Sequence, residues 1–203
     1  MQEKKFTEKE SLELISQMIQ ATKKNITKGQ GNYFIIYGYT AAFLSVMIYT
    51  LLYITHNPWW SVCWFFMFLP VIILTFKKMK NVPTVITYTD SMVNKVWQVM
   101  GTLFFLTVLV MLFLDLIIGQ CDFTLILPLC LLYASIGTAI TGLVIRESYL
   151  VYTPFVGFVF AIYMLTTHAN YGANMLWNLY FGLSFVIMMI IPGHILNNKS
   201  EKL

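Results

Sequence analysis

Charged residues are scarce in this chain, and their scarcity argues against a water-soluble fold. Asp, Glu, Lys and Arg make up 11% of the 203 residues, whereas an ordinary soluble domain contains about a quarter. Hydrophobic residues account for 58%. The apolar runs and their connections use nearly the whole length, so the sequence predicts one membrane domain and leaves no room for a soluble one.

Catalytic and metal-binding motifs are also missing. The chain has no HExxH, no GxSxG, no phosphate-binding loop and no pair of carboxylates inside an apolar run. Its three cysteines form no CxxC or metal-ligand spacing. The expected topology places His56 and His168 on one side of the membrane and His194 on the other. We therefore predict no catalytic residue, no cofactor, no metal site and no enzymatic activity.

Long hydrophobic runs are what the sequence does contain. Six of them, each about 18–23 residues long, match the ~20 residues that a helix needs to cross a bilayer. They cover residues 33–54, 59–76, 96–118, 123–145, 149–166 and 174–195. The predicted fold is all-α, an integral membrane bundle of six transmembrane helices. We assign residues 32–197 to this domain and residues 198–203 to a cytoplasmic tail.

Positive charge is absent from the three turns on one side of this pattern. All 13 Lys and Arg residues fall on the other side: Lys4, Lys5, Lys9, Lys23, Lys24, Lys28, Lys77, Lys78, Lys80, Lys95, Arg146, Lys199 and Lys202. Short cytoplasmic loops retain Lys and Arg during insertion, so we expect both termini in the cytoplasm. The net charge of +4 follows from this bias. It indicates the lipid bilayer, and not a nucleic acid, as partner.

The segment before the first run, residues 1–31, predicts a separate cytoplasmic amphipathic helix. Thr7 and Glu10 have the spacing of a capping box, in which each side chain satisfies a free N–H of the first turn. Gly29 and Gly31 are expected to stop this helix before the membrane begins.

One face of this amphipathic helix is apolar. Leu12, Ile15, Ile19, Thr22 and Ile26 follow one another at alternating spacings of three and four residues. Such a face can lie on the membrane surface, pack against the bundle, or bind the helix of a partner protein. Two heptads are too few to predict a coiled coil. We take Leu12, Ile15, Ile19 and Ile26 as the candidate interaction face and leave its occupant open.

Asp115 is the one acidic residue that the pattern places inside a span. It lies about one turn from the outer end of its helix, where a charge costs less than at the bilayer centre. The carboxylate either reaches the headgroup region and water or forms a proton or cation site. Only His56 and His168 are expected on its side as partners, and a desolvated carboxylate without a cation favours its protonated form.

His194 follows Pro192 and Gly193 at the inner end of the last run. Proline and glycine free backbone groups and permit a kink or a helix end. The motif predicts a helix terminator with an interfacial histidine, a conformational hinge, or an imidazole that faces a ligand. With Asp115, His194 makes up our candidate intramembrane polar site.

Small residues recur along the fourth run. Ala134, Thr138 and Gly142 are four residues apart, with Gly137 and Thr141 beside them. Small side chains on one stripe let helix backbones approach closely in lipid. The stripe predicts a helix-packing face, either inside the bundle or between two copies in a homo-oligomer.

Several segments resemble a family of uncharacterised multi-pass membrane proteins of Bacteroidetes. They are ESLELISQMIQ at 10–20, TYTD at 87–90 with Trp97 and Gly101, GTAITG at 137–142, and IPGHILN at 191–197. The resemblance covers the length of the chain and implies a location in the bacterial cell (inner) membrane. It implies no activity.

Two functional hypotheses remain open. In the first, the chain is a membrane interaction or regulatory protein whose N-terminal helix contacts a cytoplasmic or membrane protein partner. Patterned charge concentrates at that helix, while the bundle is almost without polar chemistry. In the second, it is a small transporter or channel component, with Asp115 and the proline-containing later spans lining a path.

Overall fold

The elements of the protein are helices and turns. The computed structural model describes residues 8–70, 72–73, 88–119 and 121–201, and no strand occurs within these ranges. The elements are α1 (Glu8–Thr55), the 3₁₀ helix η1 (Pro58–Phe68), α3 (Tyr88–Ile118), the 3₁₀ turn η2 (Phe123–Leu125), α4 (Ile126–Ile145), α5 (Ser148–Tyr152), α6 (Pro154–Tyr171), α7 (Leu176–Phe185), the π-helical η3 (Val186–Ile190) and α8 (Ile191–Glu201).

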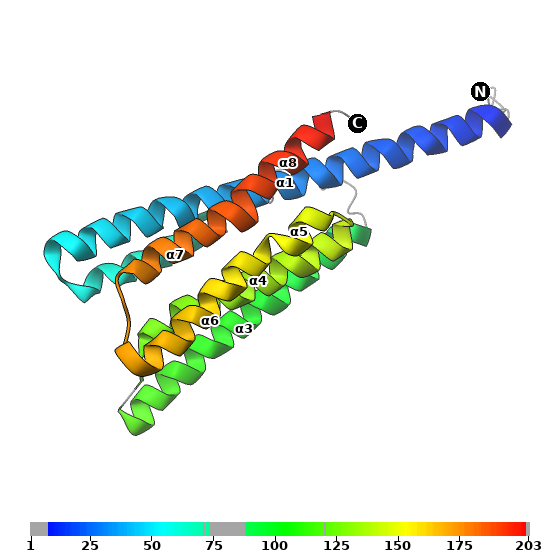
Figure 1. The fold of residues 1–203 in the computed structure, drawn as a ribbon. Helices are drawn as coiled ribbons and strands as arrows, with labels where there is room; N and C mark the ends of the chain where they lie inside the picture. The colour runs from blue at the N-terminus through cyan, green and yellow to red at the C-terminus, as the bar shows by residue number, and fades with distance from the viewer. Residues whose placement is uncertain (1–7, 71, 74–87, 120, 202–203) are drawn as a thin grey trace.

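The helices form two adjoining layers (Figure 1). In one layer α1 packs along α7, η3 and α8, with η1 on a further flank; in the other α4 packs between α3 and α6. The first residues of α1 and the last residues of α8 lie at the same end of the bundle (Figure 1). We call this the terminal end, and we call the end that holds the α1–η1, α3–α4 and α6–α7 turns the hairpin end.

Five helical segments are long and apolar enough to cross a membrane. They are Gly31–Thr55, Tyr88–Ile118, Phe123–Ile145, Ser148–Tyr171 and Leu176–Lys199. The all-α prediction is confirmed for the described residues, and these five segments support a membrane protein. The predicted second span, 59–76, is not among them: η1 and the helical residues 69–70 and 72–73 make up its described part, and the rest lies outside the described residues. The count of six spans stays a prediction.

α1 is a single helix of 48 residues. The predicted stop at Gly29 and Gly31 was wrong, because the helix runs through both and joins the amphipathic segment to the first span. Gly31 serves close packing: a Cβ there would overlap the side chain of Asn197 in α8. A glycine inside a helix costs about 1 kcal/mol relative to alanine, too little to break so long a helix. The predicted cap at Thr7 lies outside the described residues.

Small residues bring α1 close to the last helices. A Cβ on Gly38 would lie 2.6 Å from Cγ1 of Ile190, and one on Gly182 would overlap the side chain of Ser45. Buried residues recur along α1 three and four apart, the spacing of two helices that stay in contact over several turns. We call this set the covered seam: Gly31, Phe34, Gly38, Ala41, Ser45, Ile48 and Leu52.

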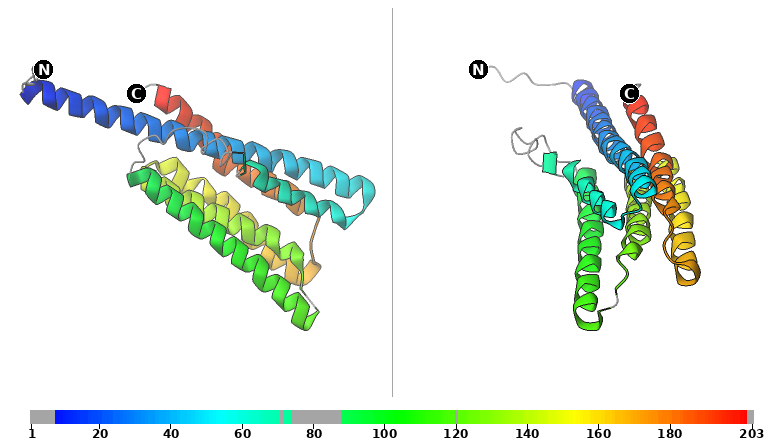
Figure 2. Two further views of the ribbon diagram at one scale, coloured as in Figure 1. Left: turned by 180° about the vertical axis from the view of Figure 1, so that it is seen from behind. Right: turned by 90° about the vertical axis from the view of Figure 1, so that its left-hand side faces the viewer.

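α3 lies at the edge of the bundle (Figure 2). Only 6% of its most apolar stretch is buried, against 56% for the segment formed by α7, η3 and α8. Among its contacts to α4 is a hydrogen bond of 2.7 Å between the hydroxyls of Thr107 and Tyr133. The last helices are therefore the centre of the bundle, and α3 is the least enclosed of the five long apolar segments.

The last helix continues past Pro192 and Gly193 to Glu201, so the predicted helix terminator was wrong. Pro192 has no N–H, and its ring crowds the carbonyl one turn earlier. The π-helical turn η3 precedes it, and the N–H of Ile191 donates to the carbonyl of Val186. Such a turn accommodates one extra residue, which relieves the crowding and lets the helix continue.

Candidate functional site

α1 extends beyond the rest of the bundle at the terminal end, and this extension, residues 8–30, carries the predicted interaction face (Figure 1). Leu12 is 68% exposed and Ile19 is 63% exposed. The polar residues Glu13 and Ser16 between them are exposed as well. The side chains of the other two members of the face, Ile15 and Ile26, lie outside the described ones. No described element covers Leu12 or Ile19.

The apolar face of the extension does not continue the covered seam. Successive residues of an α-helix are rotated by about 100°, and on that basis the face points roughly a quarter turn away from the seam that contacts α7 and α8. A face in that direction is not presented to α8. Packing against the protein's own bundle, one of the three expected occupants, is therefore not seen at Leu12 and Ile19.

The second expected occupant, the membrane surface, fits an unbroken α1 poorly. A helix on a membrane surface lies in the plane of the interface, whereas the extension continues the helix of the Gly31–Thr55 segment. With a rise of 1.5 Å per residue, Leu12 stands about 28 Å before Gly31 along the axis. Most of the apolar face is thereby held away from the start of the apolar segment.

Asp115 lies on α3, in the last turn before the hairpin end, and its side chain is exposed. Its backbone carbonyl accepts the N–H of Gly119 at 2.8 Å, which closes the helix. Within the described part of the chain its carboxylate has no ion pair or side-chain hydrogen bond. An exposed carboxylate on the edge helix is the arrangement expected for one that reaches water or headgroups.

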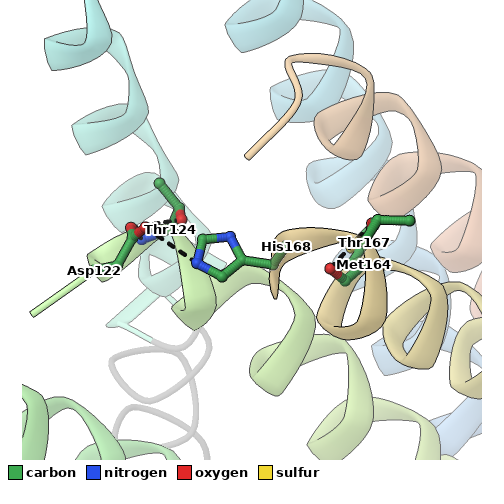
Figure 3. Close-up of polar contacts among 5 residues, drawn as sticks. All are labelled: Asp122, Thr124, Met164, Thr167 and His168. Atoms are coloured by element: carbon green, nitrogen blue, oxygen red, sulfur yellow. Dashed lines mark hydrogen bonds and ion pairs between the residues drawn. The ribbon is translucent and has the colours of Figure 1, made fainter. Parts of the chain in front are cut away.

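His168 pairs with a different carboxylate. Its Nε2 lies 3.2 Å from Oδ2 of Asp122, while Oδ1 of Asp122 accepts the N–H and the hydroxyl of Thr124 at 2.9 and 2.6 Å (Figure 3). Partial burial raises the pKa of Asp122, but the bonds from Thr124 and the charge of His168 together lower it below its ordinary value. The pair joins the α3–α4 turn to the last turn of α6.

The Asp122–His168 pair was missed by sequence reasoning, which had considered His168 as a partner of Asp115. Two signals were available. Asp122 precedes Thr124 by two residues at the start of a helix, the spacing of a side chain that caps its own backbone. His168 lies in the last turn of α6, where the helix dipole favours an imidazolium.

His194, the other predicted polar residue, lies at the terminal end and is exposed. Its Nε2 is 3.2 Å from the hydroxyl of Tyr39, and the two rings meet edge to face with centroids 6.0 Å apart. His194 thus links α8 to α1. It lies at the end of the bundle opposite Asp115, so the structure does not bring these two candidates into one site.

The predicted packing stripe on α4 is buried inside the bundle. Ala134, Thr138 and Gly142 are all buried. A Cβ on Gly142 would lie 2.7 Å from the backbone carbonyl carbon of Leu150. The absence of a side chain at Gly142 therefore lets the short helix α5 pack against α4, and it does not serve contact with another long helix. The hydroxyl of Thr138 is used within its own helix, donating to the carbonyl of Ala134 at 2.8 Å.

Asn178 is a buried polar residue that sequence reasoning also missed. Its Oδ1 accepts the indole N–H of Trp64 at 3.0 Å, and its backbone carbonyl accepts the hydroxyl of Ser45 at 2.7 Å. It therefore fastens α7 to both η1 and α1. The asparagine lies one turn into the last apolar run, and nothing in its sequence neighbourhood indicates which helix supplies its partner.

No group of three or more His, Cys, Asp or Glu side chains that could hold a metal ion occurs among the described residues. The chain matches no protein-family model, no curated protein and no solved structure.

Proposed function

We propose that the chain is a multi-pass membrane protein of the bacterial inner membrane that presents the extension of α1 to a helix of a partner protein in the cytoplasm. The observation that carries the proposal is the exposure of Leu12 and Ile19 on an unbroken helix. The lysine bias places this extension on the cytoplasmic side. The bundle would serve as the anchor that fixes its position and direction.

Continuity with the first span favours a helical partner. The face follows three-four spacing, the spacing at which two packed helices stay in contact over several turns. A free helix of two heptads is marginal in water because nucleation is costly. Here the span has already formed the helix, so the extension is ordered before it meets its partner. Less conformational entropy is then lost on binding.

A charge placed on the apolar face should abolish partner capture. The test variant is Leu12→Glu with Ile19→Glu, and the matched control is Ser16→Glu with Gln20→Glu, which adds the same charge on a neighbouring face. A photo-crosslinking residue at Lys9 reports contact in intact cells, followed by purification and mass spectrometry. The test variant should lose the crosslinked product, and the control should keep it.

The identity of the product separates the possible occupants. A crosslink to another protein in the control, lost in the test variant, supports the proposal. A crosslinked dimer of the chain would place a second copy on the face. Crosslinks to lipid alone, or equal products from both variants, would refute it. Membrane insertion is measured in parallel, and it should be equal for all variants because the span is unchanged.

The transporter alternative receives no comparable support. It requires Asp115 to line a polar path, whereas Asp115 is exposed on α3, the least buried of the long apolar segments. Its other candidate, His194, lies at the opposite end.

A further inference from the structure

A half-open hollow lies at the hairpin end, between the end of α1, the end of α6 and the α6–α7 turn. Its volume is about 650 Å³, within the range of small-molecule sites. α1 contributes two tyrosines one turn apart, and α6 contributes two more on one face. The lining residues are Tyr49, Tyr53, Tyr163, Thr167, Tyr171, Gly172, Ala173, Asn174, Met175, Leu176 and Trp177.

The lining offers aromatic faces and oxygen acceptors but no formal charge. Tyr49 and Tyr53 stack with centroids 6.2 Å apart. The hydroxyl proton of Thr167 is directed to the carbonyls of Tyr163 and Met164, at 2.7 and 3.2 Å, so its oxygen is available as an acceptor. In Figure 3, Thr167 points away from the Asp122–His168 pair. Faces of aromatic rings attract cations, because their quadrupole is negative above the ring.

The turns around the hollow contain no lysine or arginine that would repel such a ligand. None of the 13 Lys and Arg residues belongs to the turns of the hairpin end, while Asp115 and Asp122 both lie there. The imidazole of His168, which is next to Trp177 with ring centroids 5.7 Å apart, is already turned toward Asp122. A cation entering the hollow therefore meets tyrosine and tryptophan side chains and neutral oxygens, with no formal positive charge in its lining.

We propose that this aromatic hollow binds a quaternary ammonium group, either of a free organic cation or of a lipid headgroup. Quaternary ammonium is favoured because it has no N–H to satisfy, and because its charge is spread over methyl groups that pack against rings. Aromatic residues at a membrane interface are usually anchors. Four tyrosines and a tryptophan from three helices, α1, α6 and α7, gathered around one hollow, go beyond what anchoring requires.

Choline and 3,3-dimethyl-1-butanol test the proposal, because they share shape and differ only in the charged nitrogen. Binding is measured by calorimetry on the full chain in nanodiscs of phosphatidylglycerol. Choline should bind at least about fivefold tighter than the neutral alcohol, as expected for a cation over aromatic faces. Equal affinities, or no binding of choline, would overturn the proposal.

Substitutions at two lining positions assign the interaction to the rings. Tyr49→Leu with Tyr163→Leu removes two aromatic faces and should abolish the preference for choline. Tyr49→Phe with Tyr163→Phe keeps the faces and should retain it; loss of the preference there would contradict a π-face site. Tyr152→Leu, at an exposed tyrosine of the terminal end, is the control for tyrosine loss and should bind choline as the unaltered chain does.

The two sources of the ammonium group give different results in a second lipid. If the hollow takes a lipid headgroup, nanodiscs of phosphatidylcholine should weaken choline binding by competition. If it takes a free cation, the affinity should be the same in both lipids. In either case the preference for choline over the alcohol in phosphatidylglycerol is required.

Discussion

The two halves of α1 carry two apolar faces that differ in burial. Residues 31–55 bury theirs against α7, η3 and α8, whereas the described members of the face in residues 8–30, Leu12 and Ile19, are exposed. The covered half contains Gly31, Gly38 and Ser45, which let backbones approach; the exposed half contains Leu and Ile. In lipid, close packing of small residues holds helices together. In water, large aliphatic side chains give the driving force. With the proposed topology, each half would have residues that suit association in its own solvent.

Filling the covered seam should break the protein most severely. Gly182→Leu places a side chain where Ser45 already lies, and overpacking a well-packed contact costs about 1–3 kcal/mol or more. We expect a large loss of thermal stability in detergent, measured by a fluorescence-detected unfolding assay. Gly101→Leu is the matched control, because nothing lies within 4 Å of a Cβ there. Similar losses in both variants would show that the seam is not the site of the stability.

Breaking the continuity of α1 should separate its two halves. Gly29→Pro removes a helical hydrogen bond and costs about 3 kcal/mol within a helix interior, so the extension no longer continues the span. Partner capture should fall by about tenfold or more, since each 1.4 kcal/mol is a factor of ten. The bundle should keep its unfolding temperature. Gly29→Ala favours the helix and should retain capture; a loss there would mean that the glycine itself is required.

Loss of the hydrogen bond between Trp64 and Asn178 should reduce the stability of the bundle by less. Asn178→Ala leaves the indole N–H of Trp64 without its acceptor, and hydrogen bonds between membrane helices contribute about 0.6–2 kcal/mol. A double-mutant cycle with Trp64→Phe measures the coupling in the same unfolding assay. Additive effects would indicate that this hydrogen bond contributes nothing of its own.

The lengths of the apolar runs predicted the positions of buried helices. Sequence reasoning failed where the conformation of a residue depends on the helix packed against it. The spans at 33–54 and 123–145 were predicted within two residues of the observed segments. Gly29 and Gly31 predict a helix stop, because a glycine required for close packing, as Gly31 is, looks the same in sequence as a glycine at a C-cap. Pro192 predicts a helix end, because nothing in the local sequence indicates that a π-helical turn will accommodate it.

Polar pairs were the hardest to predict. The prediction that His168 lies at the same end of the bundle as Asp115 was correct. Which carboxylate it contacts, that of Asp115 or that of Asp122, depends on where the α3–α4 turn brings each of them. One turn of α3 separates the exposed Asp115 from that junction. Sequence spacing gives the face of a helix, and only the packing of the helices gives the partner.

The Asp122–His168 pair should contribute least, and this sharpens the contrast with the covered seam. Both side chains are partly exposed, and exposed ion pairs contribute about 0–1 kcal/mol. Because the folded-state pKa of Asp122 is lowered from 3.8, its contribution is present above that pH and is lost as the pH falls through the folded value. Asp122→Asn should therefore lower the unfolding temperature slightly at pH 7, and the difference from the unaltered chain should shrink as the pH falls below 3.8. An effect as large as that of Gly182→Leu, or one that does not shrink below this pH, would place a structural role at this turn that the ion pair does not explain.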